Sequence, residues 1–358
     1  MISQLARLLE FLCAHCDQAR LARSRKRFVA SLNWQAVDRP PVVVSASLPA
    51  DFPFRPFPFH EIFESPEKML HNELLDAFDL SIAAAHDVET DLPWTVRANY
   101  GTVLIASMYG AAVEQVGDNP PWVQHDSGGD MSLAQILTTD PLDMTAGWMP
   151  RVRETMESYR ALLAAYPPLD EVISITLPDL QGPFDNFEQI RGTNAFMDLL
   201  DAPELANQAM LRIAETQVAA ARYLQPCCTD GPPGYCHQHG FMLRGNILLR
   251  CDSAIMVSPE VYGDLIAPHD NWVMEQLGGG GIHCCGRMMH LVEGFLRLPA
   301  LQSLDLGQSE LNDRDQLYAL ARTRKAALIR LHITPDELAS GAFREQFPTG
   351  IAAICRNP

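Results

Sequence analysis

The sequence lacks the features that mark several classes of protein. No apolar run reaches the 18 or so residues that a membrane span requires, and the first residues carry no basic stretch followed by an apolar one, as a secretory signal would. Neither a P-loop nor a GxGxxG segment occurs, so a nucleotide cofactor is not indicated. These absences predict a cytoplasmic protein that neither crosses a membrane nor carries a nucleotide.

Basic residues are also scarce. The chain of 358 residues has 27 Lys and Arg against 44 Asp and Glu, which gives a formal net charge of −17. A surface with this balance repels phosphate backbones and anionic lipid headgroups. We therefore expect neither nucleic acid nor a membrane among its partners.

The nine cysteines are odd in number and irregularly spaced, so they do not indicate a disulfide framework. In a reduced compartment, clustered Cys and His are more often metal ligands or catalytic groups. Cys13 and Cys16 form a CxxC pair, but the pair lies in a helical pattern with no second pair beside it. We expect no metal there.

Short apolar runs alternate with longer helical patterns along most of the chain. Residues 1–38 have a helical pattern that ends at Asp38-Arg39-Pro40-Pro41. The strand candidates are Val42–Ser45, Leu80–Ala85, Val172–Leu177, Asn246–Arg250, Gly281–Cys284, Leu301–Leu306, Ala327–His332 and Gly350–Cys355. The helical patterns between them cover residues 186–200, 203–224, 258–277 and 312–324.

This alternation predicts an α/β fold with a parallel sheet and helices outside it, and at this length a TIM-like (β/α)8 barrel. No internal repeat or low-complexity linker interrupts the pattern. We therefore expect an N-terminal helical extension over residues 1–38 and a single barrel domain over 39–358. No helical pattern follows the last strand candidate, so we expect the chain to be truncated or the barrel to be closed by the N-terminal helices.

The candidate chemistry centres on an H-x-C pair, His283 and Cys285, with glycines at 278–281 before it and at 286 after it. In a strand, residues i and i+2 point to the same face, so the imidazole and the thiolate can converge on one ion. The glycines let the backbone turn at a strand end, where barrel active sites are built. Cys284 is expected to point the opposite way, into the packing between sheet and helices.

Two ligands do not hold zinc, so further ligands must come from other strand ends. Cys355 ends the last strand candidate and Asp305 lies near the end of Leu301–Leu306, and both are candidate ligands. A zinc ion held in this way would deprotonate a bound thiol at neutral pH. The alternative is that His283 is a hydrogen-bonded core histidine and that the cysteines are small hydrophobic residues.

At this point the chain resembles a known family. The segment Gly281-Ile282-His283-Cys284-Cys285-Gly286, followed by Leu301–Leu306, looks like the metal segment of the uroporphyrinogen decarboxylase superfamily. It is most similar to the branch of cobalamin-linked zinc methyltransferases, which includes the methylcobalamin:coenzyme M enzymes. Further similar stretches, spread over residues 25–355, are Arg27–Arg39, Asn99-Tyr100-Gly101-Thr102, Asp179-Leu180-Gln181-Gly182-Pro183 and Asp252-Ser253-Ala254 through Ser258-Pro259-Glu260.

The resemblance implies a TIM-like barrel in which His283, Cys285 and Cys355 bind zinc, with Asp305 near the position of an acidic fourth ligand. The N-terminal arginine-rich motif with which the decarboxylases grip porphyrin carboxylates is missing here. Residues 44–49 read Val-Ser-Ala-Ser-Leu-Pro instead. A porphyrin substrate is therefore not expected.

Other candidates lie at predicted strand ends. His237 and His239 are expected to share one face of a strand-like stretch, where they could bind a second metal or protonate a substrate. Asp252 follows a strand and is expected to contact substrate or the surroundings of the zinc ion. Asp87 is a further catalytic candidate. Each Asp that follows a strand could instead be a helix N-cap.

Four residues are candidates for binding substrate. Asp179 and Gln181 follow the strand candidate Val172–Leu177, and Asn99 and Tyr100 belong to a stretch that carries the resemblance.

The sequence therefore predicts a zinc-dependent methyltransferase that moves a methyl group between a corrinoid and a small methyl donor or acceptor. The chain has no Asp-x-His-x-x-Gly segment, so the corrinoid (methylcobalamin) is expected on a separate corrinoid protein. A homodimer is compatible with family relatives. Two alternatives remain: a decarboxylase or lyase of the same superfamily using Asp87 with His237 or His239, and a scaffold that binds without catalysis.

Overall fold

The structure is a computed structural model that describes residues 3–356 except 46–47, 49, 77–89 and 126–129. Its centre is a six-stranded parallel sheet in the order β1-β12-β11-β10-β9-β8. The strands are β1 (Val42–Ser45), β8 (Leu248–Arg250), β9 (Gly280–Cys284), β10 (Leu301–Leu306), β11 (Ala327–His332) and β12 (Ile351–Arg356). The predicted α/β class with a parallel sheet is confirmed, and β1, β10 and β11 have the predicted bounds.

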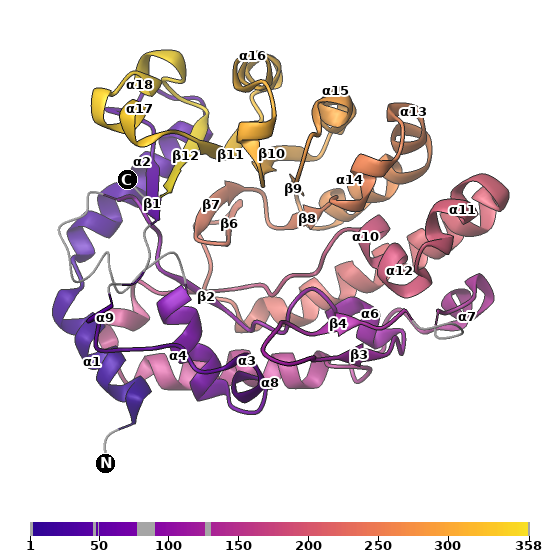
Figure 1. The fold of residues 1–358 in the computed structure, drawn as a ribbon, viewed down its shortest axis with the longest axis horizontal. Coiled ribbons are helices and arrows are strands. Elements are labelled where there is room, and N and C mark those ends of the chain that lie inside the picture. Colours follow the sequence, from indigo (N-terminus) through magenta and orange to yellow (C-terminus); the bar gives the residue numbers. More distant parts are fainter. Residues whose placement is uncertain (1–2, 46–47, 49, 77–89, 126–129, 357–358) are drawn as a thin grey trace.

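Three smaller sheets accompany this one. β2 (Thr95–Arg97) and β5 (Ser174–Thr176) pair in parallel, whereas β3 (Val113–Glu114) with β4 (Trp122–Val123) and β6 (Tyr235–Gln238) with β7 (Phe241–Arg244) pair antiparallel. The β6–β7 hairpin lies inside the curve of the large sheet, where β7 contacts β9, β10 and β11 (Figure 1).

Helices surround the strands. Figure 1 shows α13, α15 and α16 along the outer side of the large sheet and α8 on the far side of the molecule. Their bounds are α1 Gln4–His15, α2 Gln18–Leu32, α3 Phe59–Ile62, α4 Pro66–Asp76, α6 Leu104–Met108, α7 Leu133–Thr138, α8 Met149–Ala164, α9 Pro167–Asp170, α10 Pro183–Arg191, α11 Asn194–Asp201, α12 Pro203–Leu224, α13 Pro259–Val261, α14 Ala267–Gln276, α15 Met289–Arg297, α16 Arg314–Arg324, α17 Pro335–Ser340 and α18 Phe343–Gln346. Of the described helices, none combines the length and the apolarity needed to cross a bilayer.

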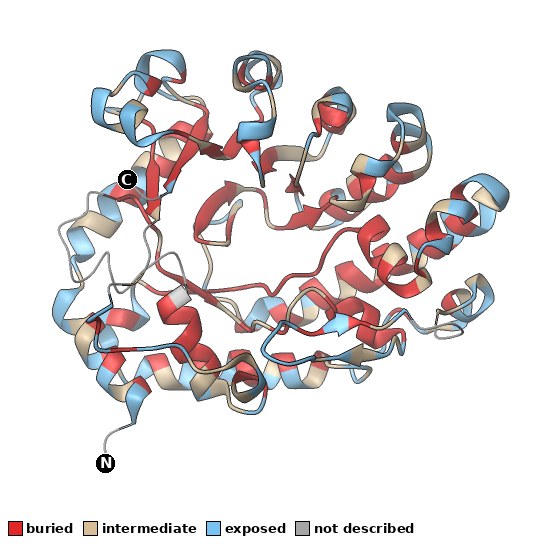
Figure 2. Ribbon diagram, viewed as in Figure 1, coloured by how far each residue is buried: buried red, intermediate tan, exposed pale blue. Residues whose placement is uncertain are grey.

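The local sequence explains where several helices begin. Asp17 caps α2 by accepting from the backbone N–H of Arg20, and Thr334 forms a capping box with Glu337 at the start of α17. The predicted start at Ser258-Pro259-Glu260 is also confirmed, because Ser258 accepts from the N–H of Val261. The strands are buried along most of their length, as expected of parallel strands covered on both faces (Figure 2).

Two predicted helices are interrupted. The pattern over 186–200 divides at Gly192, whose φ of +62° ends α10 before α11 begins. The pattern over 258–277 contains a π-helical segment, Tyr262–Ile266, between α13 and α14. The strand candidate Leu80–Ala85 lies outside the described residues.

Hydrogen bonds connect the N-terminal helix α2 to the large sheet. The backbone N–H of Gly350 donates to the Ser31 carbonyl at 2.9 Å, and the Ser31 hydroxyl donates to the Ile351 carbonyl at 2.7 Å. Asp91 is 1% exposed and accepts hydrogen bonds from Arg27 of α2 and from Arg39. α2 therefore packs directly beside β12 and β1.

Candidate metal centre

The candidate centre lies at the carboxyl end of β9. Its residue His283 is paired in register with Arg250 of β8 on one side and with Asp305 of β10 on the other. Cys285 follows the strand directly. A Cβ at Gly307 would lie 2.5 Å from the Cys285 sulfur and 3.0 Å from the His283 ring, so this position after β10 requires glycine.

Three potential ligand atoms converge at this end of the sheet. His283 Nε2 lies 3.3 Å from Cys285 Sγ and 3.5 Å from Asp252 Oδ1, and the three atoms all lie within 4.8 Å of one another. Asp252 is held in place because its Oδ1 accepts from the Cys285 backbone N–H at 2.6 Å. The expected pairing of His283 with Cys285 is what the structure shows, and Asp252 is the third member.

The two distances measured from His283 Nε2 fit a tetrahedral zinc ion. Bonds of roughly 2.0–2.3 Å in tetrahedral geometry place neighbouring ligand atoms about 3.3–3.7 Å apart. One nitrogen, one sulfur and one oxygen are ligand types that zinc accepts, and three protein ligands leave a fourth position for water or substrate. The Asp252 side chain is 40% exposed, so the group is open to solvent on one side.

A second layer of side chains orients His283. Its Nδ1 lies 3.0 Å from Asp305 Oδ2, while both Asp305 oxygens accept from Arg330 at 2.5 Å. Arg330 Nη2 also lies 2.6 Å from His283 Nδ1. A metal ion bound at Nε2 would require the proton to be on Nδ1, with Asp305 Oδ2 as its acceptor and the Arg330 guanidinium donating to the carboxylate alone.

The electrostatics keep Asp305 charged and His283 neutral. Burial alone would raise the pKa of Asp305, but Arg330 and His283 bring it well below its usual range. Burial lowers the pKa of His283, although Asp305 opposes the shift. Burial and the neighbouring Asp252 raise the pKa of Cys285 to about 11, so the thiol keeps its proton until a cation displaces it.

Two predicted ligands need correction. Asp305 approaches the other ring nitrogen of His283, so it supports that ligand and does not join the group. Cys355 lies in β12, three strand spacings from β9, where it is fully buried in register with Val44. Burial and the negative charge of Glu337 in α17 raise its pKa. Asp252, expected to contact the substrate or the surroundings of the metal, stands where Cys355 was expected.

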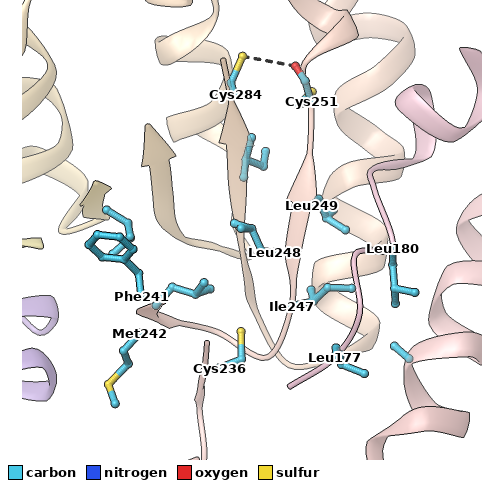
Figure 3. Packing of buried hydrophobic residues seen from close by; sticks show 14 of the residues in the cluster. Leu177, Leu180, Cys236, Phe241, Met242, Ile247, Leu248, Leu249, Cys251 and Cys284 are labelled. Atoms are coloured by element: carbon cyan, nitrogen blue, oxygen red, sulfur yellow. Dashed lines mark hydrogen bonds between the residues drawn. The ribbon is translucent and has the colours of Figure 1, made fainter. Parts of the chain in front are cut away.

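Cys284 lies outside the group, as strand alternation predicts. Its thiol donates to the Cys251 carbonyl at 3.4 Å, within a cluster of buried apolar side chains that includes Leu248 and Leu249 (Figure 3). Burial raises its pKa to about 13. Cys284 is therefore a packing residue, and it offers a matched control for Cys285.

A cavity of about 790 Å³ adjoins the metal group and shares Asp252 with it. Asn99, Asp179, Gln181 and His239, all predicted as site residues, line this cavity. Tyr100 does not, because it is 2% exposed and its hydroxyl bonds with Thr155 at 2.8 Å.

The two histidines of the β6–β7 hairpin do not share a face. His237 lies in β6, 2% exposed, with Nδ1 2.5 Å from Asp230. His239 falls in the turn, where its φ of +49° breaks the period of two. Its Nε2 faces Arg97 at 3.3 Å and also Arg250. A joint role for the pair is therefore corrected, and only His239 reaches the cavity.

Asp87 lies outside the described residues. The structure adds three residues that the sequence did not indicate: Arg97 and Arg250 line the cavity, and Arg330 holds Asp305. Asp185, which follows the strand candidate Val172–Leu177 as Asp179 and Gln181 do, also lines the cavity. Arg97 and Arg250 are the last residues of β2 and β8, so their position at strand ends was the available signal.

The charged side chains that line this cavity shift one another's pKa values. Burial alone would raise the pKa of Asp179, but Arg250 and Arg97 bring it to about 2. Burial and the nearby Asp252 raise the pKa of Asp185 to about 7, although Asp185 accepts from the backbone N–H groups of Asp252 and Ser253 at 2.9 and 3.0 Å. Asp185 thereby fixes the loop that carries Asp252.

No protein-family model matches this chain, and no match is found among curated proteins. The functional argument therefore depends on the geometry of the site.

Proposed function

We propose that this protein is a zinc-dependent methyltransferase that moves a methyl group between a corrinoid on a partner protein and a small substrate. The observation that carries the proposal is the convergence of Asp252, His283 and Cys285 within 4.8 Å beside a large cavity. The resemblance of residues 281–286 to the metal segment of cobalamin-linked zinc methyltransferases supports the same activity.

The proposal includes a TIM-like barrel as the scaffold. Among the described residues, six strands run parallel in the large sheet, and two more, β2 and β5, run parallel to each other. Contacts at both edges support closure, since the backbone N–H of Asp91, just before β2, donates to Val42 of β1 at 2.8 Å. At the other edge a Cβ on Gly182 would lie 2.0 Å from the Arg250 carbonyl, so the chain after β5 runs directly against β8.

Zinc bound by Asp252, His283 and Cys285 would polarise a thiol or similar acceptor and hold it as its anion. The residues of this chain prepare that position. Asp305 and Arg330 fix the His283 ring, and Asp185 and the Cys285 N–H fix Asp252. The cavity lined by Asp252 would give the acceptor a place beside the metal.

Transfer requires the methyl donor and the acceptor to meet in the cavity beside the metal centre. The lone pair of the deprotonated acceptor forms the new bond to the methyl carbon, and the donor keeps both electrons of the bond that breaks. The reverse direction uses the same geometry. A corrinoid protein docked over the cavity would present the second reactant. The enzyme itself is proposed to be cytoplasmic.

Zinc analysis of the purified protein tests the first step. We expect about one zinc ion per chain, and the loss of most of it in Cys285→Ser and His283→Ala, whereas Cys284→Ser retains it. Methyl transfer from methylcobalamin to a panel of thiols should follow the same pattern. Wild-type protein without zinc affinity, or activity that survives the loss of both His283 and Cys285, would refute the proposal.

A further inference from the structure

The cavity beside the metal centre has walls of different character. Three basic side chains that contact one another, Arg97, His239 and Arg250, line it and are called the basic wall here. The apolar part of the lining consists of Phe59, Pro120, Pro121 and Trp122, and the acidic part includes Asp179, Asp185 and Glu188. Asp252, which belongs to the metal centre, lies on the lining as well. The cavity is therefore both charged and apolar, with the reactive position at one side.

The basic wall has spare capacity for an anion. Arg250 donates through Nε to Asp179 at 3.0 Å, whereas Arg97 Nη1 is 3.9 Å from the same carboxylate. Both guanidinium groups face His239 Nε2, which must accept and is therefore unprotonated. Asp185, Glu188 and Asp252 also line the cavity, but the two arginines have Asp179 as their carboxylate partner there. The Nε and Nη2 groups of Arg97 make no hydrogen bond among the described residues, so their N–H donors are available to an anion.

The other wall suits a flat apolar body. Trp122 is 57% exposed, a large fraction for this side chain, and it lines the cavity beside two prolines. An indole face exposed in a concave site can stack on an aromatic ring. The volume of about 790 Å³ is within the range of pockets for ligands much larger than methanol or methylamine.

We propose that the cavity binds a planar organic anion, an aryl carboxylate or a close analogue, with its anionic group at Arg97 and Arg250 and its ring against Trp122. The proposal rests on the proposed function only in placing the reacting end of this ligand near Asp252 and the metal. A cationic ligand would face the guanidinium groups of Arg97 and Arg250, and a purely aliphatic one would leave Trp122 uncovered.

Calorimetric titration of the zinc-loaded protein tests this with four probes: 4-methoxybenzoate, uncharged methoxybenzene, 4-methoxybenzylammonium and the aliphatic anion butyrate. We expect 4-methoxybenzoate to bind at least tenfold more tightly than each of the others. Tighter binding of the ammonium probe would overturn the charge assignment, and equal binding of butyrate would overturn the aromatic one.

Substitutions locate the two contacts. Arg97→Met should weaken 4-methoxybenzoate on the order of 10- to 100-fold, as expected for a lost charge-assisted hydrogen bond. Arg97→Lys should retain the preference for the anion over the ammonium probe. This variant tests the charge assignment if Arg97→Met does not fold. Trp122→Ala should weaken 4-methoxybenzoate and methoxybenzene by similar factors. Arg297→Met, with its 79% exposed side chain on α15, is the control and should change nothing.

The same titrations on protein stripped of zinc separate the two proposals. Anion selectivity that persists without zinc supports the cavity assignment even if the protein proves not to be a methyltransferase. Zinc binding with no selectivity among the probes, or selectivity unchanged in Arg97→Met, overturns the cavity assignment while leaving the metal centre in place.

Discussion

Asp270 offers a stability test that is independent of the metal centre. It lies in α14, 1% exposed, where its Oδ2 accepts from the Tyr262 hydroxyl at 3.0 Å and from the Cys251 thiol at 3.7 Å. Its Oδ1 is buried and has no hydrogen-bond partner among the described residues. Burial therefore raises the pKa of Asp270 from 3.8 to about 7.

A carboxyl with a raised pKa stabilises the folded state when it is protonated. The contribution is present in full below 3.8, falls as the pH rises from there, and is gone above about 7, a total of about 4 kcal/mol. Between pH 5.5 and pH 8.5 the loss is about 2 kcal/mol. Asp270→Asn removes the titration and retains an acceptor for Tyr262.

Urea unfolding followed by tryptophan fluorescence, repeated between pH 5.5 and pH 8.5, measures this difference. We expect the free energy of unfolding of the wild-type protein to fall by about 2 kcal/mol more than that of Asp270→Asn. Asp264→Asn, an exposed acid of the preceding π-helical turn, is the control and should parallel the wild type. Parallel profiles for wild type and Asp270→Asn would refute the reasoning.

Three further predictions concern the centre and its support. Gly307→Ala should lower zinc affinity measured by competition with a chelator, because the added methyl group would lie 2.5 Å from the Cys285 sulfur, and Gly341→Ala, far from any ligand, should leave the affinity unchanged. Arg330→Met frees Asp305 and should weaken zinc binding on the order of 10- to 100-fold, and an unchanged affinity would contradict the role assigned to the second layer. Asp91→Asn removes the charge of the buried carboxylate that Arg27 and Arg39 share and should cost about 3 kcal/mol of unfolding free energy in urea, with a loss under about 1 kcal/mol counting against it.

The sequence predicted the strands better than the ligand set, and the reason is geometric. The period of two along a strand places His283 and Cys285 together without any knowledge of neighbouring strands. Asp252 joins them because β8 pairs with β9 so that Arg250 lies opposite His283, which brings the residue two positions later level with Cys285. That register depends on the packing of whole strands and cannot be inferred from residue spacing.

The same limit explains the misplaced ligands. The sequence predicts Cys355 and Asp305 as ligands because they lie at or near strand ends, but strand order decides which ends are adjacent. Asp305 lies in β10, next to β9, and approaches Nδ1 of His283, the ring nitrogen that faces away from Cys285. Cys355 is separated from β9 by β10 and β11. Neighbouring strands lie about 4.8 Å apart, so a residue three strands away is beyond direct contact along the sheet.

Residues with a strained backbone occur where predictions from local sequence patterns fail. Five described residues other than glycine have positive φ, and three of them, Gln181, His239 and Arg330, line the cavity or support the metal group. Arg330 sits at the register shift between Ile329 and Leu331, so the bulge turns its guanidinium toward Asp305. A side chain in this conformation costs of order 1–3 kcal/mol and persists only where its surroundings hold it. The concentration of such positions at one end of the sheet is therefore independent support for a functional site there, because a packing role would not require the strain.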